Sequence, residues 1–208
     1  ARRPGAETIL PGGRLVAPLG KQYTTGPGPF GLAVSPDGKT AVTANGGPNR
    51  YSITVLDQSR KIPALRHIIA FGKDKAEGSA KPNEDDWKSV FMGLAFENDR
   101  RLWASEGNSG RVRLMDVSTG ELRRFIDLDQ GGYSDSYTGD LALDRKRGLL
   151  YVVDQANFRV VIVDTRKNKI VASARVGRLP FAIALSPDGR RAYVTNIGLF
   201  EYRPVPGA

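Results

Sequence analysis

A short sequence recurs along this chain of 208 residues, and its recurrence restricts the fold to a repeat architecture. Two copies are nearly identical: Pro29-Phe-Gly-Leu-Ala-Val-Ser-Pro-Asp-Gly-Lys39 and Pro180-Phe-Ala-Ile-Ala-Leu-Ser-Pro-Asp-Gly-Arg190. Two degenerate copies lie between them, at 91–100 and 138–147. The equivalent turn positions are Ser35, Glu97, Asp144 and Ser186, which are separated by 62, 47 and 42 residues. A period in the forties indicates one supersecondary unit per repeat, with extra residues inserted early in the chain.

Each repeat reads as a set of short strands. The repeated sequence itself alternates small and large apolar residues and stops at a Pro-Asp-Gly or charged turn. Second runs are expected at 41–45, 102–106, 150–154 and 192–196, third runs at 52–57, 111–116 and 159–164, and fourth runs at 65–71, 122–128 and 170–176. Four short antiparallel strands in a unit of about 42–47 residues are typical of a β-propeller blade. No segment sustains helical periodicity over three turns, which argues against Rossmann and TIM-barrel folds.

The sequence therefore predicts an all-β fold, a β-propeller of four-stranded antiparallel blades. Its expected parts are an N-terminal arm (1–14), a closing strand (15–28), a blade (29–72), an insertion (73–90), two further blades (91–130 and 131–177) and a partial blade (178–208). About three and a half blades are present, whereas a ring of seven blades of about 43 residues needs roughly 300 residues. An open ring exposes the unpaired faces of its terminal blades, so we expect a longer protein or a second chain to complete it.

Two sequence runs carry a resemblance to known propeller families. Ala192-Tyr-Val-Thr-Asn196, which comes after Leu-Ser-Pro-Asp-Gly-Arg190, resembles the signature of YVTN-repeat β-propellers, bacterial proteins that are often periplasmic or surface-exposed. Leu150-Tyr-Val-Val-Asp-Gln-Ala-Asn-Phe-Arg-Val-Val-Ile-Val-Asp164 is similar to an NHL repeat, a related propeller unit. The resemblance runs from about Leu15 onward and implies the fold more strongly than any function, because propellers serve both as binding platforms and as enzymes.

The two ends of the chain carry a second resemblance. Leu10-Pro-Gly-Gly-Arg-Leu-Val-Ala-Pro-Leu-Gly20 and Thr195-Asn-Ile-Gly-Leu-Phe-Glu-Tyr202 are similar to bacterial proteins in which a propeller precedes an alkaline-phosphatase-type phosphoesterase domain. This resemblance implies a substrate-positioning role beside a catalytic domain, none of whose residues lie in these 208.

Composition excludes several classes of protein and site. The chain has no cysteine, so it can form neither disulfides nor a thiolate zinc site, and no apolar run reaches the roughly 20 residues that span a bilayer. It begins at Ala1 without an apolar leader, so we expect a periplasmic or secreted protein whose signal peptide has been removed. The net charge is +9, but basic residues alternate with acidic or apolar ones, so a solvated surface is favoured over a nucleic-acid groove.

The irregular loops predict where the functional surface lies. In a propeller blade the loops between second and third strands share one face of the ring with the connections between blades. That face receives the segments 46–51, 73–89 and 129–137, whereas the turns expected on the opposite face are short and regular. Because long loops on a rigid scaffold usually carry function, we expect the binding site on the face of the long loops.

Two sets of residues on that face are candidates for a ligand site. The first comprises acceptors at the ends of the second strands, namely Asn45, Glu106, Asp154 and Asn196, which either line a channel and hold a cation or cap their own loops. The second comprises aromatic and guanidinium groups, namely Arg50, Tyr51, Trp87, Arg111, Tyr133, Tyr137 and Arg159, which either bind a partner or serve blade packing. Asp127, Asp129, Asp135 and Asp140 form a weaker calcium candidate, with solvated carboxylates as the favoured interpretation.

Catalytic groups are scarce. His67 is the only histidine and falls on an expected fourth strand, at the outer edge of a blade, and no Gly-x-Ser-x-Gly elbow occurs. The sequence therefore favours a non-catalytic binding module, without cofactor or metal, that recognises a protein or a small anionic ligand. The alternative is the propeller part of a phosphoesterase, and the remainder of the ring is expected from the same protein or from another chain.

Overall fold

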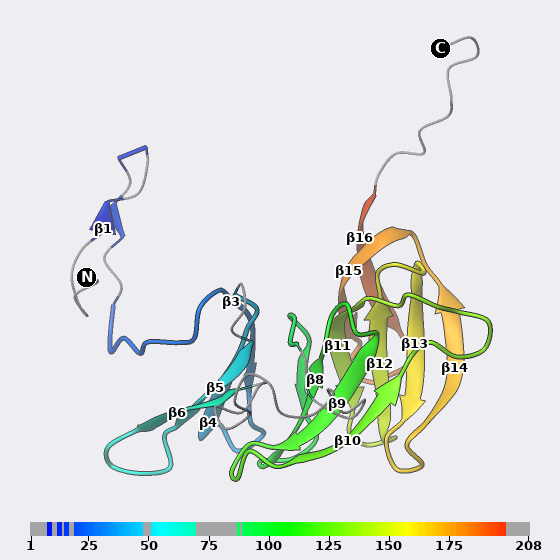
Figure 1. The fold of residues 1–208 in the computed structure, drawn as a ribbon. Helices are drawn as coiled ribbons and strands as arrows, with labels where there is room; N and C mark the ends of the chain where they lie inside the picture. The colour runs from blue at the N-terminus through cyan, green and yellow to red at the C-terminus, as the bar shows by residue number, and fades with distance from the viewer. Residues whose placement is uncertain are drawn as a thin grey trace, which may run out of the picture.

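The computed structural model shows an all-β arrangement of twisted sheets side by side around part of a ring (Figure 1). It describes residues 8–9, 12–13, 15–16, 19–47, 51–69, 87 and 89–198. This part of the chain contains no helix that is long and apolar enough to cross a membrane.

Three sheets are complete four-stranded antiparallel blades. The first consists of β3 (Pro29–Val34), β4 (Thr40–Asn45), β5 (Ser52–Asp57) and β6 (Ala64–Ile69). The second consists of β7 (Leu94–Phe96), β8 (Arg101–Ser105), β9 (Arg111–Asp116) and β10 (Leu122–Asp127). The third consists of β11 (Thr138–Asp144), β12 (Leu149–Asp154), β13 (Arg159–Asp164) and β14 (Lys169–Arg175). A partial fourth blade consists of β15 (Arg178–Leu185) and β16 (Ala192–Gly198).

The predicted fold is confirmed. The third strands β5, β9 and β13 have the expected bounds, and the second strands lie within two residues of theirs. The first strands of consecutive blades, β3, β7, β11 and β15, contact one another in sequence, which makes them the innermost strands of the ring. About three and a half blades are present, as the repeat indicated.

The closing strand expected over 15–28 stays a prediction. Leu15–Val16 (β2) pairs with Thr8–Ile9 (β1) in a small separate hairpin and does not add to the last blade. A closing strand would pair with the third strand of the blade that it completes, and among the described residues the partial blade has only β15 and β16.

The repeated sequence builds the same turn twice. In the first blade Ser35 Oγ donates to Asp37 Oδ1 at 2.6 Å, and the same carboxylate oxygen accepts the backbone N–H of Lys39 at 3.0 Å. In the partial blade Ser186 Oγ and the N–H of Arg190 make the same two bonds to Asp188, again at 2.6 and 3.0 Å. Bonds of this kind stabilise the ionised carboxylate, so the side-chain and then the backbone donors lower the pKa of Asp37 and of Asp188.

The hydrophobic core lies between the blades. Period-two alternation directs Val42 and Val55 of the first blade toward Phe96 and Met115 of the second, and all four are at most 1% exposed. A second cluster joins the second and third blades, and a smaller one joins the third blade to the partial fourth. Because each cluster is shared, a blade is stabilised mainly by its neighbours.

The two terminal blades leave apolar side chains uncovered. On β3 the alternate residues Phe30, Leu32 and Val34 are 57%, 71% and 52% exposed, and on β16 Tyr193 and Ile197 are 58% and 61% exposed. Soluble proteins seldom leave such apolar surface open, so these faces are where further blades would pack.

The innermost strands approach one another at glycines. A Cβ built on Gly31 would lie 2.0 Å from the carbonyl oxygen of Met92, and one on Gly93 would lie 2.3 Å from that of Gly139. These positions therefore exclude any side chain, because the obstructing atoms belong to the backbone of the next blade. At the equivalent place in the third blade Asp140 directs its carboxylate to the N–H of Ile183 at 3.0 Å.

We expect Gly93→Ala to lower the free energy of unfolding by about 1–3 kcal/mol, because the inner strands must separate to admit the methyl group. Gly46→Ala is the matched control, since its Cβ would lie 3.4 Å from the carbonyl oxygen of Val90. Urea unfolding of both variants measures the difference. Equal stability of the two variants would contradict the close approach of β7 to β11.

The turn aspartates predict a stability that depends on acid pH. Their folded-state pKa values lie below the unfolded value of about 3.9, so their contribution is complete above that pH and is lost as pH falls through the folded values. We expect the melting temperature to fall below about pH 4. The double variant Asp37→Asn/Asp188→Asn keeps an acceptor oxygen but cannot titrate, so its melting temperature should fall less steeply. An identical acid limb in both proteins would count against this role.

Candidate functional site on the long-loop face

The ring segment has two unlike faces. We call the face that carries segments 24–28, 46–47, 106–110, 128–137, 155–158 and 176–177 the long-loop face, and the face that carries turns 35–39, 58–63, 97–100, 117–121, 145–148, 165–168 and 186–191 the short-turn face. The first strand of each blade begins on the long-loop face, because Pro29 pairs with Asn45 at the end of β4 and Pro180 pairs with Asn196 in β16.

Aromatic rings from all the blades meet at the inner edge of the long-loop face. Phe30 stacks on Phe91 with centroids 5.4 Å apart, and Phe181 of the partial blade meets Phe30 edge-on at 6.4 Å. Tyr137 packs edge-on against Phe91 at 5.2 Å. β3 and β15 are the first and last of the inner strands, so the rings of Phe30 and Phe181 meet across the central opening of the ring. We call these four residues the aromatic cluster.

A polar pocket lies beside the aromatic cluster, between the first and second blades. Its volume is about 320 Å³, and it is lined by Tyr51, Ser89, Asn108, Ser109 and Arg111. Gly107, next to Asn108, joins the pocket to the cluster, because a Cβ built on it would lie 3.3 Å from Cβ of Phe91 and 3.5 Å from the Tyr137 hydroxyl. Burial raises the pKa of the Tyr137 phenol, and Tyr51 adds to that rise. Two residues predicted from the sequence, Tyr51 and Arg111, therefore meet in one pocket.

The guanidinium of Arg111 is held in place at this pocket. It lies over the ring of Phe125, 4.4 Å from the centroid, and its Nε is 3.4 Å from Oδ2 of Asp127. The ring of Phe125 and the carboxylate of Asp127 orient the guanidinium at the rim of the pocket, and the Arg111 side chain remains 15% exposed to solvent.

The acceptors at the ends of the second strands do not surround a common channel. Glu106 is fully buried and pairs with Arg113 of the same blade, and it also accepts the hydroxyl of Ser109 at 2.9 Å. Each carboxylate oxygen thus has a partner within the blade. Glu106 secures the loop between the second and third strands, which corrects its assignment to a ligand site.

Asp154 is the counterpart of Glu106 in the third blade. It is fully buried, and its Oδ2 accepts Arg159 Nε at 2.8 Å and Ser136 Oγ at 3.0 Å. Its Oδ1 accepts the N–H of Tyr137 at 3.1 Å, which attaches the connection from the second blade to the third. Arg159 is only 2% exposed and lies under the ring of Tyr133, 3.5 Å from its centroid. Asp154 and Arg159 are therefore structural, and Tyr133, which is 38% exposed, covers them.

The two asparagines are also bonded within their blades. Asn45 is fully buried, and its Nδ2 donates to Ser52 Oγ at 3.1 Å and to Thr54 Oγ1 at 2.8 Å. Asn196 is partly buried, and its Nδ2 donates to the carbonyl of Val194 at 3.3 Å. The Oδ1 atom of Asn196 is buried and has no hydrogen-bond partner in the part of the chain that the structure describes.

The aspartates proposed as calcium ligands go to separate partners. Asp127 faces Arg111, Asp129 accepts the N–H of Ser136 at 2.9 Å, and Asp140 bonds to the N–H of Ile183. Within the described ranges, no three His, Asp or Glu side chains come together as metal ligands.

Trp87 is a core residue. Its side chain is 1% exposed and belongs to the cluster that joins the first and second blades. Of the two interpretations that the sequence left open, packing between blades is therefore correct and the binding-surface assignment is wrong. The residues next to Trp87 in the sequence are polar, so nothing there indicated a core residue. Arg50 lies outside the described residues.

His67 occupies the fourth strand of the first blade, as expected, and is exposed. Its Nδ1 lies 3.0 Å from the hydroxyl of Thr54, the same hydroxyl that Asn45 contacts. The histidine therefore extends the structural hydrogen bonds of its own blade toward the outer edge.

Sequence reasoning missed the phenylalanines of the aromatic cluster. Phe30 and Phe181 stand at the same position of the two near-identical repeats, directly after proline, where a strand interior was expected. The sequence did contain an indication of the cluster, because both near-identical repeats have a phenylalanine at the same position near the start of the first strand.

Comparison with solved structures supports the propeller fold. The chain is similar to Kuenenia stuttgartiensis hydrazine synthase (18% identity, TM-score 0.62, covering 88% of this chain and 47% of that one). It is also similar to a functionally unknown protein from Desulfotomaculum acetoxidans DSM 771 (16%, 0.59, 88% and 52%) and to U3-55K (16%, 0.56, 77% and 43%). The chain thus spans about half the length of these structures. No protein-family model matches it, and neither does any curated protein.

We expect Trp87→Ala to lower the free energy of unfolding by about 3–5 kcal/mol, because it empties a large part of the core between two blades. Tyr193→Ala removes an exposed aromatic and should change stability by no more than about 0.5 kcal/mol. Denaturant unfolding monitored by circular dichroism measures both. A Trp87→Ala protein as stable as the control would show that the tryptophan does not anchor the core.

Proposed function

We propose that the chain is a β-propeller binding module that recognises a protein partner or a small anionic ligand through its long-loop face. The observation that carries this proposal is the aromatic cluster with its adjoining pocket, where Tyr51 and Arg111 line a polar hollow beside Phe91 and Tyr137. Aromatic and arginine side chains dominate the energetics of protein interfaces because they bury large areas at small entropic cost.

The chemistry of the pocket favours an anionic group on the ligand. Arg111 offers a planar guanidinium suited to a carboxylate or phosphate, and Asn108, Ser109 and Tyr51 add hydrogen-bonding groups around it. A partner would place an acidic side chain in the pocket and an apolar side chain against the aromatic cluster. A free anion would use the pocket alone.

The module belongs, in this proposal, to a complete ring of about seven blades. The uncovered residues of β3 and β16 and the coverage of about half of each similar structure support that inference. The missing blades come from the remainder of the same protein or from another chain. The resemblance to YVTN-type repeats supports an exported location.

Partner capture from the exported fraction of the source cells tests the proposed face. We expect proteins enriched by the wild-type chain to be retained at least about tenfold less by Arg111→Gln/Tyr133→Ser, which removes a charge and an aromatic ring from the long-loop face. Arg190→Gln, an exposed change on the short-turn face, is the control and should retain them. Mass spectrometry quantifies each protein, and melting curves verify that the variants are folded.

Two results would contradict the proposal. One is equal retention of every enriched protein by the long-loop variant. The other is a loss caused by Arg190→Gln alone, which would place the interface on the opposite face.

A further inference from the structure

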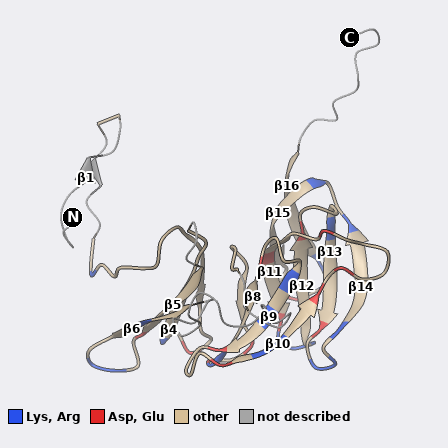
Figure 2. Ribbon diagram, in the orientation of Figure 1, with Lys and Arg blue, Asp and Glu red and all other residues tan. Residues whose placement is uncertain are grey.

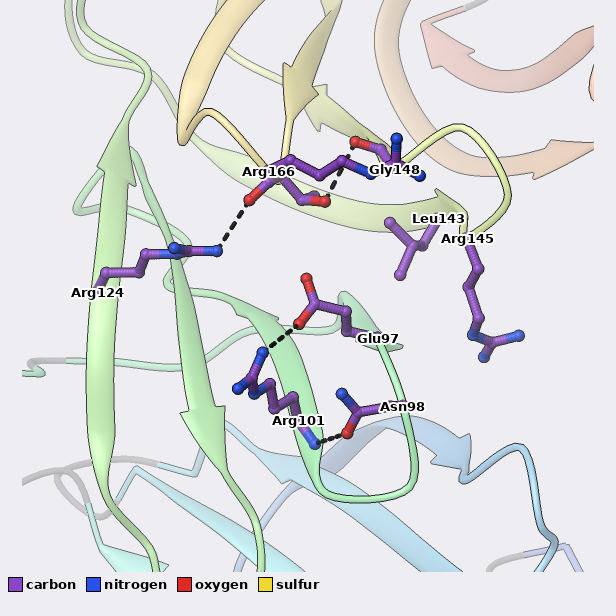
Figure 3. A pocket seen from close by; sticks show the side chains of 9 residues that line it. Glu97, Asn98, Arg101, Arg124, Leu143, Arg145, Gly148 and Arg166 are labelled. Atoms are coloured by element: carbon purple, nitrogen blue, oxygen red, sulfur yellow. Dashed lines mark hydrogen bonds and ion pairs between the residues drawn. The ribbon is translucent and has the colours of Figure 1, made fainter.

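A second pocket lies on the short-turn face, between the second and third blades, and is lined mainly by arginine. Its volume is about 320 Å³, and four guanidinium groups surround it, those of Arg101, Arg124, Arg145 and Arg166. Figure 3 shows Arg124 and Arg145 on opposite sides of the pocket, with Leu143 and Glu97 between them in this view. We call it the arginine pocket.

Backbone carbonyls fix three of these guanidinium groups. Arg124 of the second blade donates from Nη2 to the carbonyl of Thr165 at 2.8 Å, and Arg145 of the third blade donates from Nε to that of Phe96 at 2.8 Å. Arg166 donates from Nη2 to the carbonyl of Lys146 at 3.0 Å. Gly148 leaves room for it, since a Cβ there would lie 2.8 Å from Arg166 Nε. The cations are therefore positioned before any ligand binds.

The positive charge of the arginine pocket is only partly neutralised. Arg101 lies 3.6 Å from Glu97, whereas Arg124, Arg145 and Arg166 form no ion pair with any residue that the structure describes. The Nε atom of Arg124 is buried and has no hydrogen-bond partner in the same part of the chain. Elsewhere on this face arginines do meet acids: Arg147 pairs with Asp144, and Arg123 lies near Asp116. At the interface of the second and third blades, three of the four arginines therefore have no acidic partner among the described residues.

The turns themselves explain why bases gather on this face. Figure 2 shows Lys and Arg along the edge that carries the short turns. In these turns an aspartate accepts backbone N–H groups and basic residues follow it, as in Asp144 with Arg147 and Asp164 with Arg166 and Lys167. The carboxylate oxygens point back into the turn, and the following side chains extend outward.

We propose that the arginine pocket binds the phosphate group of a small phosphorylated ligand. Guanidinium groups bind phosphate oxygens with paired N–H donors, and Arg124, Arg145 and Arg166 each have donors beyond the one that is bonded to a carbonyl. The pocket lies within the size range of small-molecule sites, at its lower end, which suits a phosphate monoester rather than a larger cofactor.

Glu97 and Leu143 define the rest of the ligand. Glu97 pairs with Arg101, which offsets its repulsion of the phosphate, and its carboxylate is placed to accept a hydrogen bond from a hydroxyl of the ligand. Leu143 offers an apolar wall to a short carbon chain or ring. The ligand class is therefore a phosphate monoester that carries a hydroxyl close to the phosphate, as sugar phosphates do.

Titration calorimetry of the full-length protein with ribose 5-phosphate and with inorganic phosphate, at constant ionic strength, tests the site. We expect saturable binding of ribose 5-phosphate that weakens at least about tenfold in Arg166→Gln, because the variant loses a charge-assisted hydrogen bond to the phosphate. Arg166 is exposed, so the variant should remain folded, which its melting temperature verifies. Arg190→Gln removes the same charge outside the pocket and should bind like wild type.

A second variant separates geometry from charge. Arg124→Lys keeps the charge but loses the planar fork, so binding should weaken although net charge is unchanged. Inorganic phosphate should compete for the same site, with lower affinity because it lacks the neighbouring hydroxyl. The proposal is overturned if Arg166→Gln and wild type bind equally, or if Arg166→Gln and Arg190→Gln lose binding equally. It is also overturned if only a single-stranded oligonucleotide binds, with a steep salt dependence, since the face would then act as a diffuse polyanion surface.

Discussion

The contact between the backbones of neighbouring inner strands is the constraint on which the rest of the structure depends. Gly31 faces the carbonyl of Met92, and Gly93 faces that of Gly139, with no space for a side chain between them. At this spacing the apolar faces of adjacent blades close on shared cores. A hollow opens at the long-loop end of the first interface, and one of similar size opens at the short-turn end of the second. The aromatic cluster forms because each inner strand has a large aromatic residue near its start, on the long-loop side of the ring. Blade packing creates the pockets, and the residues that line them differ in chemistry between the two faces.

Buried charge in this fold holds loops together. Glu106 and Asp154 occupy equivalent places in successive blades, and both are fully buried. Glu106 pairs with Arg113, the third residue of β9, whereas Asp154 pairs with Arg159, the first residue of β13. Removing such ions from water is costly unless the remaining hydrogen-bonding positions are filled, and here hydroxyl and backbone donors fill them. Asp154 in particular joins β12, β13 and the segment that arrives from the second blade. In the first blade the neutral pair of Asn45 and Thr54 serves the same position, and Thr54 accepts the N–H of Gly26. The position needs an acceptor that reaches the loop, whether or not it is charged.

The sequence predicted the strands closely and the site only in part, for a physical reason. Strand bounds depend on alternation and on turn residues, both of which are local, so the third strands were placed to the residue. Whether Trp87 or Arg159 faces solvent depends on the neighbouring blade, which no local pattern encodes, and both are buried. The spacing of the arginines in the sequence also indicates the arginine pocket. Arg101, Arg124, Arg145 and Arg166 follow one another at 23, 21 and 21 residues, about half a blade, so each stands at a successive turn of the same face. A search at half the repeat length finds it.

The separation of charge between the two faces follows from how the turns are built. Each short turn needs an acceptor for its N–H groups. An aspartate supplies it in turns such as 35–39, 165–168 and 186–191, and Asn98 supplies it in turn 97–100, while the bases that follow remain at the surface. On the long-loop face Glu106 and Asp154 lie at strand ends and pair with arginines inside the blades, and the aromatic cluster lies at the inner edge of the face. The same four-stranded unit thus presents aromatic rings at one end and guanidinium groups at the other. The strands between them are stiff and their cores are closely packed, so the two faces act as separate recognition surfaces fixed at opposite ends of one scaffold.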